Sequence, residues 1–150
     1  MEIERKYLID KNKLPMNYNE YPYHEIEQAY LCTEPVVRVR RSDYKYYMSY
    51  KSKGLMVREE YNLPLTKDGY EHLLEKADGI IIKKKRYLIP YDGYTVELDI
   101  FEDSYDGLVL AEVEFETEEQ ANTFQAPEWF GEDVTFDTKY HNSTLSQGKE

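Results

Sequence analysis

The sequence predicts an α+β protein dominated by an eight-stranded antiparallel β-barrel, closed on itself and covered by helices. Three observations lead to this class. Much of the chain alternates with a period of two, which is the signature of strands. Short segments containing proline, glycine and aspartate separate these stretches, as in an antiparallel meander. Seven of the eight predicted strands carry charged side chains on one face, which suits a closed barrel with a charged interior.

The strands follow from the alternating stretches. They are predicted at residues 2–9, 25–32, 36–42, 45–53, 56–64, 80–90, 93–102 and 109–116. The dipeptide Asp92-Gly93 is a hairpin turn signal, because both residues tolerate the positive φ of a tight turn. Sixteen tyrosines against one tryptophan also favour strands with a partly exposed face.

Three helices are predicted between and after the strands. Thr66 can cap a helix that runs to about Ala77, with Gly79 ending it. Thr117 can cap a second helix to about Phe124, with Gln120 as its capping-box partner. A short third helix is expected at residues 139–145. We expect helices, or a partner chain, to cover the apolar face of the sheet.

Composition limits the classes of function. The 150 residues suit one domain spanning 1–150. A net charge of -11 argues against a general nucleic-acid binder. The single cysteine, Cys32, permits no intramolecular disulfide and no multi-cysteine metal site, which fits the reducing cytoplasm. Residues 1–6 lack the apolar core of a signal peptide, and no apolar run approaches the roughly 20 residues of a membrane span.

The charged strand face carries equal numbers of bases and acids, segregated by sign into pairs two residues apart. The eight bases are Lys6, Arg38, Arg40, Lys51, Lys53, Arg58, Lys84 and Arg86. The eight acids are Glu2, Glu4, Glu60, Glu97, Asp99, Glu112, Glu114 and Glu116. For any one strand a solvated outer face explains such residues, since antiparallel sheets often have one wet face. The segregation of signs over seven strands favours a charged interior instead.

This interior predicts a chemistry. Buried unpaired charges cost several kcal/mol each, so such an interior is reasonable if a bound polyanion and its divalent metals neutralise it. Clustered arginine and lysine suit phosphate oxygens, and clustered carboxylates suit Mg²⁺ or Mn²⁺. Together they indicate metal-dependent phosphoryl transfer on a ligand with several phosphates. The histidines His24, His72 and His141 are scattered and are interpreted as surface or structural residues.

Several motifs resemble one known family. Glu2-Ile3-Glu4-Arg5-Lys6 is similar to the ExExK signature of the CYTH superfamily, the triphosphate tunnel metalloenzymes, and the resemblance continues in order to about residue 145. The other matching stretches are residues 28–31, 37–40, 51–53, 58–61, 84–87, 97–99, 111–115 and 129–134. The family fold is an eight-stranded antiparallel barrel whose tunnel is lined by charges. Lys83-Lys84-Lys85 departs from the usual neighbours of the central lysine and leaves the register there open by one residue.

The resemblance implies roles for the charged residues. The predicted metal ligands are Glu2, Glu4, Glu112 and Glu114, to which the acidic face adds Glu60 and Asp99. The predicted phosphate-binding residues are Lys6, Arg38, Arg40, Lys51, Lys53, Lys84, Arg86 and Lys139, to which the basic face adds Arg58. Lys6 and Tyr30 match residues implicated in catalysis in the short bacterial members.

The resemblance therefore implies an enzyme that hydrolyses inorganic triphosphate with Mg²⁺ or Mn²⁺ in the cytoplasm. Its ligand would be a triphosphate-bearing small molecule, with neither nucleic acid nor membrane as a partner, and a homodimer is left open. A thiamine triphosphatase, a nucleoside triphosphatase or a class IV adenylyl cyclase is an alternative, although no added segment for binding adenine is visible. A non-catalytic polyphosphate-binding module is a third reading, which the retention of both carboxylate pairs disfavours.

Overall fold

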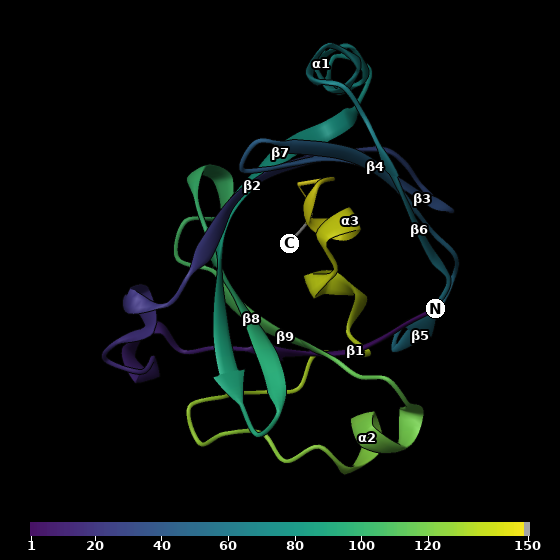
Figure 1. Ribbon diagram of the computed structural model, residues 1–150. Helices are drawn as coiled ribbons and strands as arrows, with labels where there is room; N and C mark the ends of the chain where they lie inside the picture. The colour runs from purple at the N-terminus through teal and green to yellow at the C-terminus, as the bar shows by residue number, and fades with distance from the viewer. Residues whose placement is uncertain (149–150) are drawn as a thin grey trace.

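Nine antiparallel strands form one curled sheet in the computed structural model, which describes residues 1–148 (Figure 1). The strands are β1 (Glu2–Leu8), β2 (Tyr23–Thr33), β3 (Val36–Ser42), β4 (Lys45–Lys51), β5 (Val57–Arg58), β6 (Glu60–Pro64), β7 (Asp78–Tyr91), β8 (Tyr94–Phe101) and β9 (Val109–Glu114). Their order in the sheet is β5-β1-β9-β8-β7-β2-β3-β4-β6. The predicted antiparallel barrel is thus confirmed, with nine strands in place of eight.

The extra strand arises where the barrel closes. The predicted strand 56–64 divides at Glu59, so that β5 pairs with β1 at one end of the sheet and β6 pairs with β4 at the other. The backbone N–H of Ser52 donates to the Glu59 carbonyl at 3.0 Å, on the side of β4. Because β5 and β6 are consecutive in the chain, the polypeptide itself spans the seam between the two ends of the sheet.

Two local expectations about the strands are settled. Asp92 and Gly93 both have positive φ, 49° and 81°, and join β7 to β8 as the predicted hairpin turn. The open register on β7 resolves in favour of Lys84, which is 1% exposed and points into the barrel, while Lys83 and Lys85 point outwards. β4 ends at Lys51, two residues before the predicted end.

Two of the predicted helices cover the outside of the barrel (Figure 1). Helix α1 (Lys67–Leu74) is capped by Thr66, whose hydroxyl accepts from the Gly69 N–H, and its Tyr70 packs in a cluster with β2 and β3. Helix α2 (Glu118–Thr123) has the expected capping box and packs over the outer faces of β1, β8 and β9. Among residues 1–148, no helix has the length and hydropathy needed to cross a membrane.

The third predicted helix lies inside the barrel. It appears as a 3-10 turn at Thr138–Tyr140 followed by α3 (Asn142–Leu145), which sits within the ring of strands (Figure 1). Leu145 packs in an apolar cluster with inward side chains from one end of the strands. That cluster contains Tyr30, Val36, Ile82, Phe101, Leu110 and Val134. The barrel interior is therefore apolar and filled at this end, and charged beyond it.

Candidate active site

A cavity of about 300 Å³ occupies the charged part of the barrel. It is lined by Glu2, Glu4, Lys6, Tyr30, Val36, Arg38, Arg40, Tyr47, Lys51, Arg58, Glu60, Asn62, Arg86, Glu97, Glu112, Glu114, His141, Asn142 and Ser143. Most of the predicted site residues are in this set, because successive inward positions on a strand are two residues apart. Lys84 and Asp99 are buried behind the wall and touch Arg86 or each other.

Besides Lys84, two predicted phosphate-binding residues are not brought into this cavity. Lys53 lies beyond the end of β4, with a side chain 81% exposed that pairs with Glu34 at 3.0 Å. Lys139 is exposed in the turn before α3, where its ammonium lies over the Tyr140 ring. For Lys53 the reason is the bend at Gly54, where φ is +137° and the strand alternation no longer holds.

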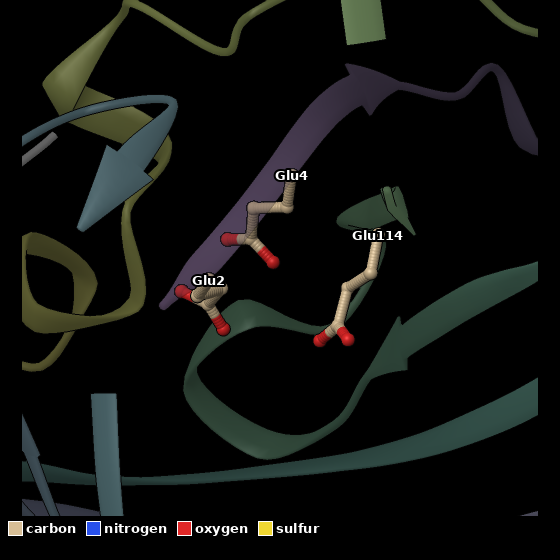
Figure 2. A group of neighbouring side chains, drawn as sticks. All are labelled: Glu2, Glu4 and Glu114. Atoms are coloured by element: carbon tan, nitrogen blue, oxygen red, sulfur yellow. The ribbon is translucent and has the colours of Figure 1, made fainter. Parts of the chain in front are cut away.

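Three carboxylates form a cluster on one wall. Glu2 and Glu4 lie side by side on β1, and Glu114 of β9 faces them (Figure 2). One oxygen from each lies within 4.8 Å of the others. Burial, reinforced by Glu112 and Glu2, raises the pKa of Glu4 to about 8, and burial with Glu97 and Glu2 raises the pKa of Glu114 to about 7. Glu4 and Glu114 resist ionising together, so a divalent cation bound in the cluster would relieve their repulsion.

The other predicted metal ligands pair with basic side chains, as Glu2 of the cluster also does, with Lys51 Nζ at 3.2 Å and Arg58 Nε at 3.5 Å. Glu112 lies 3.3 Å from Lys6 Nζ and 3.3 Å from Arg86. Asp99 receives Lys84 Nζ at 2.7 Å and Arg86 Nε at 2.7 Å. Burial acts to raise the pKa of both carboxyl groups, but these cations outweigh it and hold each pKa below its usual range.

Glu60 of β6 is paired in the same way, with Lys51 Nζ at 3.1 Å. Burial opposes its ionisation, but Lys51 outweighs it and lowers the pKa of Glu60 to about 2. Glu60, Asp99 and Glu112 are therefore ionised and already have a cation beside them, unlike Glu4 and Glu114.

The basic wall contains guanidinium groups that still have unused donors. Arg38 buries a side-chain Nε that has no hydrogen-bond partner, and the buried Nε of Arg58 has none either, although it lies 3.5 Å from Glu2 Oε1. Arg38 is 4% exposed, and burial together with Arg40 lowers its pKa. A buried donor without an acceptor costs about 1–3 kcal/mol, more for a charged group. An anion bound beside these arginines would supply the missing acceptors.

The two predicted catalytic residues lie in different surroundings. Lys6 Nζ donates to the Tyr140 carbonyl at 3.2 Å as well as pairing with Glu112. The Tyr30 hydroxyl accepts from Gln28 Nε2 at 3.2 Å, and Gln28 Oε1 accepts from Arg40 Nε at 2.7 Å. Both side chains reach the cavity, Lys6 from β1 and Tyr30 from the apolar end of β2.

Some cavity residues were not among the predicted site residues. Tyr47 and Asn62 share the inward faces of β4 and β6, so strand alternation could have found them. His141, Asn142 and Ser143 come from the chain that enters the barrel, and the sequence interpretation of His141 as surface or structural missed its place on the wall. No local pattern marks these three residues, because only the tertiary fold brings the C-terminal segment inside.

The fold and the cavity define a class of protein: a barrel whose interior offers an acidic cluster for a hard cation and a basic wall for a polyanion. The comparisons with known proteins give the family. The model of the family described as "CYTH domain" matches residues 1–149, and the chain belongs to this family.

The chain is similar to curated relatives over nearly its whole length. It is 36% identical to an inorganic triphosphatase of Nitrosomonas europaea, over 97% of this chain and 96% of the relative. It is 33% identical to an inorganic triphosphatase of Acetivibrio thermocellus, over 96% and 92%. A solved inorganic triphosphatase structure, 34% identical, superposes with a TM-score of 0.72 over 98% of this chain and 95% of that one.

Proposed function

We propose that this protein hydrolyses inorganic triphosphate with the help of a divalent metal. The observation that carries the proposal is the division of the cavity into two walls. Glu2, Glu4 and Glu114 cluster on one wall, and Arg38 keeps an unpartnered Nε donor on the other. A cavity of about 300 Å³ is at the small end of ligand sites, which run from about 300 to 1,000 Å³. The triphosphatase relatives support the same conclusion.

The metal would be Mg²⁺ or Mn²⁺, held by Glu2, Glu4 and Glu114. This set offers only carboxylate oxygens, the ligands that hard cations prefer. Such an ion neutralises charge on phosphate oxygens and strengthens the electrophilic character of phosphorus. Glu60, Asp99 and Glu112 are proposed to orient the bases with which they pair, since each already faces a lysine or an arginine.

The protein's own residues would bind and align the substrate. The guanidinium groups of Arg38 and Arg40 lie side by side on β3 and can bridge successive phosphates. Lys51, Arg58 and Arg86 extend this positive wall around the cavity. Preorganised cations are catalytic when they meet charge that develops in the transition state. We propose that Lys6, beside Glu112, and the Tyr30 hydroxyl orient the reacting groups.

The proposed compartment is the cytoplasm, and the proposed domain is the whole chain from residue 1 to 150. A homodimer is compatible with this function.

The experiment is phosphate release from tripolyphosphate, pyrophosphate, ATP and thiamine triphosphate, each with Mg²⁺ and with Mn²⁺. We expect kcat/KM to be highest for tripolyphosphate and activity to vanish with excess chelator. A higher kcat/KM for ATP or thiamine triphosphate would reassign the substrate to an organic triphosphate. Tripolyphosphate binding without turnover under any condition would leave a binding module.

A further inference from the structure

Hydrogen bonds through Thr135 and Tyr140 connect His141 to Lys6. Lys6 N–H donates to Thr135 Oγ1 at 2.9 Å, and Lys6 Nζ donates to the Tyr140 carbonyl at 3.2 Å. The His141 ring nitrogen Nε2 lies 3.3 Å from the carbonyl of Thr135. These three hydrogen bonds join the C-terminal segment inside the barrel to β1, and they hold the imidazole of His141 against the wall of the cavity.

The contact with Thr135 also decides which nitrogen of His141 carries the proton. A carbonyl oxygen can only accept, so Nε2 must donate and carry hydrogen. Burial, reinforced by Lys6 and by Arg58, lowers the pKa of His141 to about 4, so the free protein holds a neutral ring at neutral pH. In that tautomer Nδ1 carries a lone pair, which accepts no hydrogen bond from the described residues.

The other proton acceptors that line the cavity, its carboxylates, already have partners or belong to the proposed metal site. Glu2, Glu4 and Glu114 form the proposed metal cluster. The remaining carboxylates each face a cation: Glu60 with Lys51, Glu112 with Lys6 and Arg86, and Glu97 with Arg86 through Oε2, while Glu97 Oε1 has no hydrogen-bond partner. Among the cavity-lining groups of residues 1–148, His141 is the proton acceptor that neither belongs to the carboxylate cluster nor pairs with a cation.

We propose that His141 Nδ1 accepts the proton of the water that attacks the terminal phosphorus. This step rests on the proposed function. The water oxygen forms a bond to phosphorus, the bond from phosphorus to the bridging oxygen breaks, and its electron pair leaves with pyrophosphate. The proton of the water passes to Nδ1 and then to solvent, which returns the ring to its neutral form. The products are pyrophosphate, orthophosphate and one released proton.

Charge and access both favour this role. Burial and, to a smaller degree, the nearby cations depress the pKa of the ring, and the negative charges of a bound triphosphate would raise that pKa again. His141 also lines a second cavity of about 250 Å³. That cavity shares Val36, Arg58, His141 and Ser143 with the main one. The ring therefore lies where the two cavities meet, and the second one offers water and the released proton a path.

The test compares two substitutions in the full-length protein. His141→Gln keeps an amide N–H that can donate to Thr135 but removes the basic lone pair, whereas His141→Ala removes both. We expect kcat on tripolyphosphate to fall about 100-fold or more in each, the usual range for a lost general base, with KM within about threefold of wild type. Imidazole added to His141→Ala should restore kcat, and more basic imidazoles should restore it further. His72→Ala, on the exposed side of α1, is the matched control and should change nothing.

Each outcome is decisive. If His141→Gln retains wild-type kcat, the ring is only a brace for Thr135 and the proposal fails. A loss in His141→Ala that no imidazole reverses, or a change confined to KM, also overturns it. The melting temperatures of both variants show whether a loss of kcat is caused by unfolding. If His141→Ala is unfolded, the kcat of His141→Gln alone decides. A wild-type protein that hydrolyses no triphosphate would refute the proposed function and this step with it.

Discussion

The acidic cluster makes metal affinity depend steeply on pH. A cation needs ionised carboxylates, and the folded protein raises the pKa of Glu4 to about 8 and that of Glu114 to about 7. Below these values a proton must leave before the metal binds. Lowering the pH therefore weakens binding, and the apparent affinity for Mg²⁺ should rise as the pH increases from 6 to 9.

The magnitude follows from the two pKa values. At pH 6 Glu4 lies about two pH units below its pKa, so its ionisation weakens metal binding about 100-fold. Glu114 lies about one unit below its pKa, and its ionisation weakens binding about tenfold. If both must ionise, Mg²⁺ binds about 1,000-fold more weakly at pH 6 than above pH 8. Because the two groups repel each other and lose protons in shared steps, the smallest change that we expect is about tenfold.

Isothermal titration calorimetry of Mg²⁺ binding, in pairs of buffers with different ionisation enthalpies, measures both the affinity and the protons released. We expect one to two protons released at pH 6 and close to none at pH 9. Glu114→Gln is the control, because it should remove about one of these protons. It also separates the cluster from Lys84, whose pKa burial lowers to about 7 despite the neighbouring Asp99. An affinity that is constant over this range, with no proton release, would refute the reasoning.

Three further predictions concern substrate and turnover. Arg40→Ala should weaken tripolyphosphate binding by about 2–4 kcal/mol, or about 30- to 1,000-fold. The control is Arg5→Ala, which should lower the melting temperature without this loss of affinity, because the Arg5 guanidinium pairs with Asp133 outside the cavity. Equal losses of affinity in the two variants would contradict the assignment of strand faces. Tyr30→Phe should reduce kcat about tenfold with little change in KM, and an unchanged kcat would limit Tyr30 to packing. Tripolyphosphate should raise the melting temperature more than pyrophosphate at equal saturation, because a longer anion reaches more of the basic wall. High salt should reduce this stabilisation, because it screens the charges. Equal shifts with the two anions would contradict the argument from the length of the anion.

The sequence predicted the inward face of the strands well, because the two-residue period fixes each face once a strand is placed. Arg38 and Arg40 on β3, and Glu112 and Glu114 on β9, reach the cavity as the pattern requires. The same rule fails where a strand ends early. Lys53 lies beyond the end of β4, next to Gly54, and points to solvent, although it continues the alternation of Lys51.

The sequence could not predict how charges pair across strands. Glu112 and Glu114 occupy equivalent positions in the pattern, yet only Glu112 lies opposite Lys6, because the register between β1 and β9 sets that pair. The register between strands must therefore be known before the carboxylates of the acidic cluster can be distinguished from those that form ion pairs. His141 is a stronger case, since a segment distant in sequence carries it into the barrel, and the resemblance that assigned Lys139 to the site did not single out His141.

The position of the bound metal and phosphates tests the central claim most directly. We would measure anomalous diffraction from crystals of Glu114→Gln and of the wild-type protein, both grown with Mn²⁺ and tripolyphosphate. We expect an Mn²⁺ peak among Glu2, Glu4 and Glu114 in the wild type, weakened in the variant, with phosphate density against Arg38 and Arg40. Manganese and phosphate bound only outside the barrel would contradict the account.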